Sequence, residues 1–377
     1  MTKFKSTKTV FVEINNGSNL NFTEVDQAEL PDLERNSVLI QVKACSLSSW
    51  LHCCGNVGKD PATEVLCQAI GKIGGNPNKS CKLPAGQDIA GVVKAVGEDV
   101  TTLAKGDYVV GIIPLDYGQS GCADFVVLQE FDVVHIPDGV SFVDAAGCVG
   151  DAVKAYIALH YMGRLGGSDD TVLVLNGATS LGSTLLQLAH HWGARVMTSC
   201  SSNDEKTYIQ SLGVPLLQVV ELNEKNQSLK AACNAETGNL GVNIIIDTIA
   251  SLPTQMDSNI IEEEKVEPLV RPTKHDIISC LAVGGRWVTC EPNLQLDPPN
   301  SKLLFLRCAS VGFLCEQAWM LSHAQQGRYQ HILMDIMRKV GTGIIRPNIH
   351  HTVTFDGVKD ALKHLPKIRV GKVVLTL

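Results

Sequence analysis

A stretch of small and polar residues, N-G-A-T-S-L-G (176–182), lies where an apolar strand is expected to turn into a helix. The run TVLVLNG (171–177) has the character of a buried strand that ends in a glycine, and LGSTLLQLAHHWG (181–193) has leucines at helical spacing. The N-terminus of a helix in such a unit offers backbone N–H groups, and phosphates bind there. The pattern therefore predicts a dinucleotide site. The residues expected to form it are Asn176, Gly177, Ala178, Thr179, Ser180, Leu181 and Gly182.

The tip of the next expected strand decides which dinucleotide would fit. The strand ARVMTSC (194–200) leads into T-S-C-S-S (198–202), which contains no Asp or Glu. An acidic residue there would accept the ribose 2′-OH of NAD and repel a 2′-phosphate, so its absence favours NADPH. Cys200, Ser201 and Lys206 complete the expected cofactor site. Lys206 is the nearest cation that could contact the 2′-phosphate. The alternative is that Lys206 is a solvent-exposed helix residue that binds no phosphate.

Two kinds of segment must position these residues. The first 135 residues consist of short apolar strands separated by Gly, Pro and Asp, which is an all-β pattern. From about residue 140 strands alternate with helices, which predicts a parallel sheet with helices on both faces. The expected strands are 37–45, 88–97, 107–114 and 123–128, then 171–177, 194–200, 242–249 and 284–290.

Further segments set the expected domain boundaries. Segment 141–163 has helical spacing, and a helix over 357–364 precedes a last strand at 369–377 that should return to the first domain. We therefore expect one domain formed by 1–135 with 345–377, and a second formed by 136–344. Segments 55–85 and 251–275 lack periodicity and are expected to be long exposed insertions.

Composition excludes several functional classes. The net charge of −7 is spread along the chain without a Lys/Arg block, which argues against nucleic-acid binding. No apolar run reaches the roughly 18 residues needed to span a bilayer, and the first residues do not resemble a signal peptide. The 13 cysteines are scattered and odd in number, as expected for reduced thiols. These features predict a cytoplasmic protein without direct membrane insertion.

Ordered motifs along nearly the whole chain resemble the medium-chain dehydrogenase/reductase superfamily. They are GQDIAGVVKAVG (86–97), KGDYVVG (105–111), IPDGVSFVDAA (136–146) and GKVVL (371–375). A second set is similar to the zeta-crystallin-like branch of animal quinone oxidoreductase-like proteins. That set is KHDII (274–278), GGRWVT (284–289) and NLQLDPP (293–299).

The resemblance implies an α/β fold made of two parts. A GroES-like β-barrel domain is completed by the C-terminus, and a Rossmann domain with a doubly wound parallel sheet lies between its two segments. The cleft between the domains would hold a nicotinamide cofactor and a small-molecule substrate. The implied activity is NAD(P)H-dependent reduction of quinones or other activated carbonyl compounds.

Measured against that family, the nucleotide loop is degenerate. Relatives usually show G-x-x-G-x-x-G, whereas this sequence has Asn176, Thr179 and Gly182 at the three positions. Asn tolerates the left-handed backbone of the turn. Thr179 places a β-branched side chain where the pyrophosphate would approach, but its hydroxyl could instead bond a phosphate oxygen. The loop could bind NADPH in this way, or it could pack well and bind nothing.

The zinc ligands of metal-dependent relatives are replaced. Ser48 occupies the position of their first cysteine ligand, and Gln87-Asp88 occupies the position of their His-Glu pair. Catalytic zinc needs three good ligands, and a serine hydroxyl and an amide are poor ones. A cluster of His52, Cys53 and Cys54 is conceivable, but adjacent residues point in different directions. We expect no metal.

Catalytic residues are not assigned by the sequence. Ser48-Ser49-Trp50-Leu51 occupies the position of the family's N-P-x-D element. The Ser48 hydroxyl could polarise a quinone oxygen, or it could simply bond local backbone. Tyr156 matches a family T-A-Y element in which Lys154 replaces the threonine, and His190 and His191 are expected at the surface.

Two functions compete at this point. The leading hypothesis is a zinc-independent, NADPH-dependent oxidoreductase of quinone-reductase type. The second is a catalytically inactive scaffold subunit of an endosome-associated assembly that engages a Rab GTPase, which the resemblance suggests together with recruitment to early endosomes. The degenerate loop, the lost N-P-x-D element and the two insertions favour the second. A homodimer is also expected, through the apolar run LLFLRCASVGFL (303–314) at a sheet edge.

Overall fold

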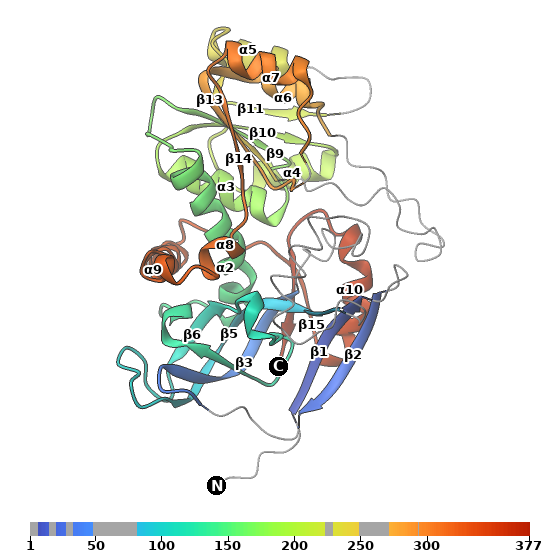
Figure 1. Cartoon of the computed structure of the whole chain (residues 1–377). Helices are drawn as coiled ribbons and strands as arrows, with labels where there is room; N and C mark the ends of the chain where they lie inside the picture. The colour runs from blue at the N-terminus through green and yellow to red at the C-terminus, as the bar shows by residue number, and fades with distance from the viewer. Residues whose placement is uncertain are drawn as a thin grey trace.

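The computed structural model describes residues 7–14, 20–27, 33–47, 81–222, 229–248, 271–292 and 294–377 (Figure 1). Most of the two segments interpreted as insertions, Ser48 to Leu51, and the His52, Cys53 and Cys54 cluster lie outside these residues. Within them, no helix is both long and apolar enough to cross a membrane.

A parallel sheet of six strands forms the centre of the second part of the chain. Its order is β11-β10-β9-β12-β13-β14, and every neighbouring pair is parallel. The strands are β9 (Thr171–Leu175), β10 (Arg195–Cys200), β11 (Gln218–Glu221), β12 (Val242–Asp247), β13 (Leu281–Thr289) and β14 (Ser310–Phe313). The helices that connect them are α3 (Ser180–His191), α4 (Asn203–Ser211), α5 (Leu229–Thr237), α6 (Lys274–Cys280) and α7 (Pro298–Leu306).

Helices cover both faces of this sheet because alternate strand residues point to opposite sides. Val172 and Val174 of β9 pack in the core that contains α3, whereas Leu173 and Leu175 pack in the core that contains α5, α6 and α7. Such a continuous apolar strand is typical of a sheet buried on both faces. The predicted doubly wound parallel sheet is confirmed.

A mixed sheet of seven strands forms the other part. Its order is β15-β16-β3-β5-β6-β8, and β7 pairs with β3. The strands are β3 (Ser37–Leu47), β5 (Gly86–Val96), β6 (Tyr108–Ile112), β7 (Phe125–Gln129), β8 (Val133–His135), β15 (Ile349–Val353) and β16 (Lys372–Thr376). The last strand of the chain, β16, lies antiparallel to β3, so the C-terminus completes the sheet of the N-terminal part (Figure 1).

Smaller elements surround this sheet. Strands β1 (Thr7–Ile14), β2 (Leu20–Gln27) and β4 (Cys81–Pro84) form a separate antiparallel sheet. The remaining α-helices of the described residues are α8 (Gln317–Met320), α9 (Gln326–Gly341) and α10 (Val358–His364). Short 3-10 turns lie at Leu115–Tyr117, Glu130–Asp132, His323–Gln325, Phe355–Gly357 and Leu365–Lys367.

Helix α2 (Phe142–Tyr156) lies between the two large sheets (Figure 1). Its alanines share one core with Ala44 and Ala90 of the mixed sheet and with Leu185 of α3. The sequence predicts one helix over 141–163, whereas α2 ends at Tyr156 and continues as a π-helix over Ile157–Met162.

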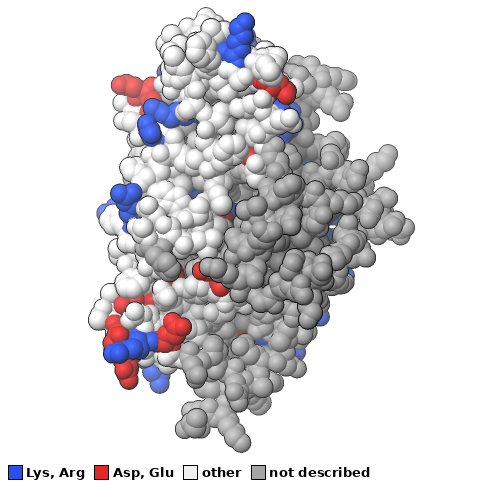
Figure 2. All heavy atoms as spheres, viewed as in Figure 1, with Lys and Arg blue, Asp and Glu red and all other residues white. Residues whose placement is uncertain are grey.

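The apolar run 303–314 differs from a simple edge strand. Its first part is the end of α7, and only Ser310–Phe313 forms β14, the last strand in the sheet order. On the face shown in Figure 2, acidic and basic side chains of the described residues are interspersed.

Candidate functional site

The loop between β9 and α3 makes its turn at Asn176. This residue has φ of 57°, in the left-handed region that asparagine tolerates better than most residues. Its backbone N–H donates to the Ser199 Oγ at 3.1 Å, which ties the loop to β10. A Cβ on Gly177, the residue after Asn176, would lie only 2.2 Å from the Thr198 Oγ1, so glycine is required at position 177.

Thr179 is the N-cap of α3. Its Oγ1 accepts a hydrogen bond from the Gly182 N–H at 2.9 Å and donates to the Asn176 carbonyl at 3.0 Å. The sequence left open that this hydroxyl binds a phosphate oxygen. In the structure its proton is engaged inside the loop, so Thr179 stabilises the turn and the helix end. Gly182 is required beside it, because a Cβ there would lie 2.3 Å from the Asn176 carbonyl oxygen.

The loop keeps polar groups that a bound anion or cofactor would satisfy. Among the described residues, the structure shows no hydrogen-bond acceptor for the backbone N–H groups of Ser180 and Leu181 in the first turn of α3. The Asn176 side chain is 3% exposed, and neither of its polar atoms has a described partner. A buried amide without partners is unfavourable by itself. The residues present therefore fit a dinucleotide.

The tip of β10 differs from the expectation. The sequence showed no acidic residue at 198–202, but the Glu205 carboxylate in the first turn of α4 accepts the Ser201 N–H at 2.6 Å. Ser202 caps α4 by accepting the Glu205 N–H at 3.2 Å, so this acidic residue is brought back to the tip by helix geometry. The Ser201 hydroxyl is buried without a described partner.

The other two predicted cofactor residues at this tip have different environments. Cys200 is buried, and burial raises the pKa of its thiol to about 11, so it stays protonated at neutral pH. The ammonium of Lys206 lies 3.8 Å from the Glu221 carboxylate on β11. Lys206 is thus engaged in an ion pair at the surface.

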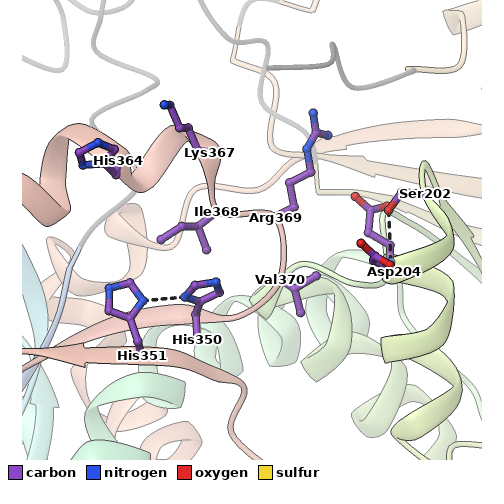
Figure 3. A pocket seen from close by; sticks show the side chains of 10 residues that line it. Ser202, Asp204, His350, His351, His364, Lys367, Ile368, Arg369 and Val370 are labelled. Carbon is purple, nitrogen blue, oxygen red and sulfur yellow. Dashed lines mark hydrogen bonds between the residues drawn. The ribbon is translucent and has the colours of Figure 1, made fainter. Parts of the chain in front are cut away.

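A cavity of about 480 Å³ lies beside this tip (Figure 3). Ser202, the N-cap of α4, and Asp204 and Glu205 of its first turn line one side. The opposite side comes from residues close to the C-terminus. These residues are His350, His351, His364, Lys367, Ile368, Arg369 and Val370.

The cavity carries more potential cations than acids. Figure 3 shows the rings of His350 and His351 side by side, with their Nδ1 atoms 2.6 Å apart, and segment 367–370 above them. Sequence reasoning missed this site because the two sides lie about 150 positions apart in the chain, and no motif links them.

Charged residues are buried behind the nucleotide loop. The ammonium of Lys372, at the start of β16, lies 2.8 Å from the Asp88 carboxylate of β5 and 3.2 Å from the Asp151 carboxylate of α2. The Ser180 hydroxyl also lies near enough to affect the pKa of Asp151. Burial acts to raise the pKa of Asp151, but Lys372, Lys154 and this hydroxyl together hold it below its usual range.

The former zinc-ligand positions are engaged in other contacts. Gln87 is buried, and its Nε2 donates to the Ile113 carbonyl at 2.7 Å. Asp88 pairs with Lys372. Among the residues that the structure describes, no group of three or more His, Cys, Asp or Glu side chains could hold a metal.

The remaining sequence candidates lie away from the loop. His190 and His191 are exposed at the C-terminal end of α3. The Tyr156 ring packs edge-on against Trp192, with centroids 5.1 Å apart. None of these three residues lines the cavity.

Thr179 provides a first test of the loop. We expect Thr179→Val to lower the free energy of unfolding by about 1 kcal/mol, because the N-cap bond to Gly182 is lost while the side-chain shape is kept. Thr179→Ser retains the hydroxyl and should stay close to the parent in urea denaturation. Equal stability of all three proteins would contradict the capping role.

Asp151 provides a pH-dependent test. Its folded-state pKa is lowered, so its contribution is present above the unfolded value of about 4 and is lost as pH falls through the folded value. We expect Asp151→Asn to unfold about 2 kcal/mol more easily at pH 7. Urea denaturation at successively lower pH should show this gap closing. A gap that does not depend on pH would argue against the ion pair with Lys372.

The chain is similar in sequence to known proteins. No family model matches it. The chain is 35% identical over 357 residues to Quinone oxidoreductase-like protein 1 of Mus musculus, and the match covers 95% of each. It is 26% identical over 293 residues to a pikromycin polyketide synthase component of Streptomyces venezuelae. That match covers 78% of this chain but only 7% of the synthase.

Solved structures show the same fold. The CurK enoyl reductase has a TM-score of 0.75 and 19% identity, with 99% of both chains covered. A mycobacterial protein solved in complex with NADPH has a TM-score of 0.74 and 19% identity, covering 99% of this chain and 100% of that one. With the motifs, the two-sheet architecture and the mouse relative, these matches lead to one assignment: the chain belongs to the quinone oxidoreductase-like family of the medium-chain dehydrogenase/reductase superfamily.

Proposed function

We propose that this protein is a zinc-independent, NADPH-dependent oxidoreductase of quinone-reductase type. The observation that carries the proposal is the nucleotide loop, where the N–H groups of Ser180 and Leu181 and the side-chain amide of Asn176 have no hydrogen-bond partner among the described residues. These donors suit the pyrophosphate of a dinucleotide at a helix N-terminus. When bound, the nicotinamide would supply hydride to a quinone or an activated carbonyl compound.

The cavity beside α4 supports NADPH over NADH. Lys367 and Arg369 line it across from Ser202, the N-cap of α4. A 2′-phosphate placed there would meet these cations and the N-terminus of α4, and hydrogen bonds from charged donors are the stronger kind. Asp204 and Glu205 also line the cavity, and their carboxylates oppose part of the attraction between these cations and a phosphate, although Glu205 accepts the Ser201 N–H.

Independence from zinc is supported by the contacts of Gln87 and Asp88. Metal-dependent relatives need their His-Glu pair directed at the ion, whereas here Gln87 bonds the Ile113 carbonyl and Asp88 bonds Lys372. Hydride transfer to a good electrophile requires positioning and exclusion of water more than acid–base groups. Ser48, whose hydroxyl could polarise a quinone oxygen, lies outside the described residues.

None of the contacts among the described residues favours the alternative, a non-catalytic scaffold subunit on early endosomes. Several of the relatives and solved structures carry the names of oxidoreductases or reductases. The scaffold interpretation gains weight only if the loop binds no dinucleotide.

Titration with NADPH and NADH tests the proposal. We expect NADPH to bind at least about tenfold more tightly than NADH, because one additional charged hydrogen bond raises affinity by about that factor. Nicotinamide fluorescence reports the binding of both nucleotides. Arg369→Gln should weaken NADPH by about tenfold and leave NADH unchanged. Lys363→Gln is the matched control, since Lys363 lies on the neighbouring α10 but does not line the cavity.

The same samples test chemistry and the metal. Reduction of a simple quinone by NADPH should proceed and should survive treatment with a chelator. A parent protein that binds neither nucleotide would refute the proposal and favour the scaffold. Equal weakening of both nucleotides in Arg369→Gln would refute the assignment of the cavity to the 2′-phosphate.

We further propose a homodimer formed through β14. This strand ends the sheet order, and the apolar side chains of Phe305, Leu306 and Phe313 beside it are 79%, 64% and 52% exposed. Exposed apolar residues at an unpaired strand edge favour pairing with a second copy.

Light scattering checks the dimer. The parent should have the mass of two chains at micromolar concentration, and Phe305→Glu with Phe313→Lys should shift it to one. Met334→Glu, at an exposed residue of α9, is the control and should stay dimeric. A monomeric parent would overturn the proposal.

A further inference from the structure

The charged groups behind the nucleotide loop form one buried cluster. Lys372 bridges Asp88 and Asp151, and Lys154 of α2 lies 3.1 Å from the Glu316 carboxylate just before α8. The side chains of Lys372, Asp88 and Asp151 are 15%, 12% and 9% exposed. Each of the three comes from a different element: β16, β5 and α2.

The cluster reaches the nucleotide loop through Asp151. This residue lies on α2, which packs against α3 in one core, and the hydroxyl of Ser180, the first residue of α3, is among the groups that hold the pKa of Asp151 low. The first turn of α3 is the anion-binding end of the helix, where the macrodipole favours negative charge. A carboxylate is thus already present beside the position where a pyrophosphate would bind.

The balance of charge in the cluster makes Lys372 important. The cluster has three carboxylates and two ammonium groups, and Lys154 is paired with Glu316. Without Lys372, both Asp88 and Asp151 would lose their direct cationic partner. Charges taken out of water are weakly screened, so two uncompensated carboxylates would repel an anion at the end of α3.

We propose that Lys372 is a positioning residue for the dinucleotide site, which it makes receptive by neutralising the Asp88 and Asp151 carboxylates behind the first turn of α3. This inference rests on the proposed function. Lys372 is not among the residues that line the cavity, and its ammonium pairs with Asp88 and Asp151, so it acts through Asp151.

The experiment compares dinucleotide affinity in three variants. Lys372→Met should weaken NADPH and NADH by the same factor, about tenfold or more, because the pyrophosphate is common to both. The neutral variant Asp88→Asn/Asp151→Asn/Lys372→Met removes the repelling charges together with the cation. It should bind NADPH within about threefold of the parent.

Lys339→Met is the matched control for loss of a buried ammonium. Lys339 is 5% exposed and pairs with Asp335 on α9, away from the loop. It should bind both nucleotides like the parent, whatever its effect on stability. If Lys372→Met does not fold, the neutral variant still tests the proposal, because NADPH affinity well below that of the parent would contradict it.

The outcomes separate this inference from the proposed function. Parent-like affinity in Lys372→Met, or a neutral variant that binds as weakly as a single variant lacking Lys372, would overturn the role of charge. So would a loss of NADPH binding alone, because the 2′-phosphate end would then be affected.

Inorganic pyrophosphate provides the independent readout. It should raise the melting temperature of the parent and of the neutral variant but not that of Lys372→Met. A parent that binds pyrophosphate without NADPH would refute only the proposed function. A parent that binds neither would refute both.

Discussion

The close approach of helix α2 to the mixed sheet is the constraint on which the rest of the structure depends. A Cβ on Gly147 would lie 2.1 Å from the Ile349 side chain, and a Cβ on Gly150 would lie 2.4 Å from the Asp88 carboxylate. Only a helix of small residues can lie this near the strands and still pack against α3 on its other side. The core that joins the two sheets is built on this helix.

The buried charges are a consequence of that approach and of strand register. Ser46 of β3 lies opposite Val374 of β16 on one side and opposite Asp88 of β5 on the other. The register therefore brings Lys372, two residues before Val374, close to Asp88. Gly150 leaves the space for the carboxylate beneath α2. A carboxylate in such a place needs a cation, since burial of an unpaired charge is highly unfavourable.

Much of this fold could be predicted from the sequence because periodicity reports burial directly. The continuous apolar run at 171–175 and the leucines of 181–188 led to β9 and α3 with ends correct within a few residues. The turn at Asn176 was also expected from its tolerance of positive φ. Such features are local, and local sequence carries them.

The features that were not predicted depend on contacts between distant segments or on hydrogen-bond direction. The cavity joins Ser202 to His350 and Arg369, and no sequence pattern links them. Glu205 was not counted at the tip of β10 because only the first turn of α4 brings its carboxylate there. A hydroxyl such as that of Thr179 can donate in several directions, and the folded loop alone shows which acceptor it uses.

The loop shows how a degenerate fingerprint can keep its geometry. Glycine in the first two positions of the family pattern allows a sharp turn and a close backbone, and here Asn176 and Thr179 reach a similar turn by other means. Asn176 accepts the left-handed conformation, and Thr179 bonds both its carbonyl and the Gly182 N–H, which fixes the turn from within.

Internal bonding of this kind has a consequence for binding. The N–H of Gly182 is occupied by the cap, so fewer donors face an incoming phosphate than in a glycine-only loop. Those of Ser180 and Leu181 have no described partner, and the positive end of the α3 dipole is unchanged. If the loop binds a pyrophosphate as proposed, we expect affinity to depend more on the surrounding charge than on the count of donors. The ion pairs behind the loop would then matter more than the missing glycines.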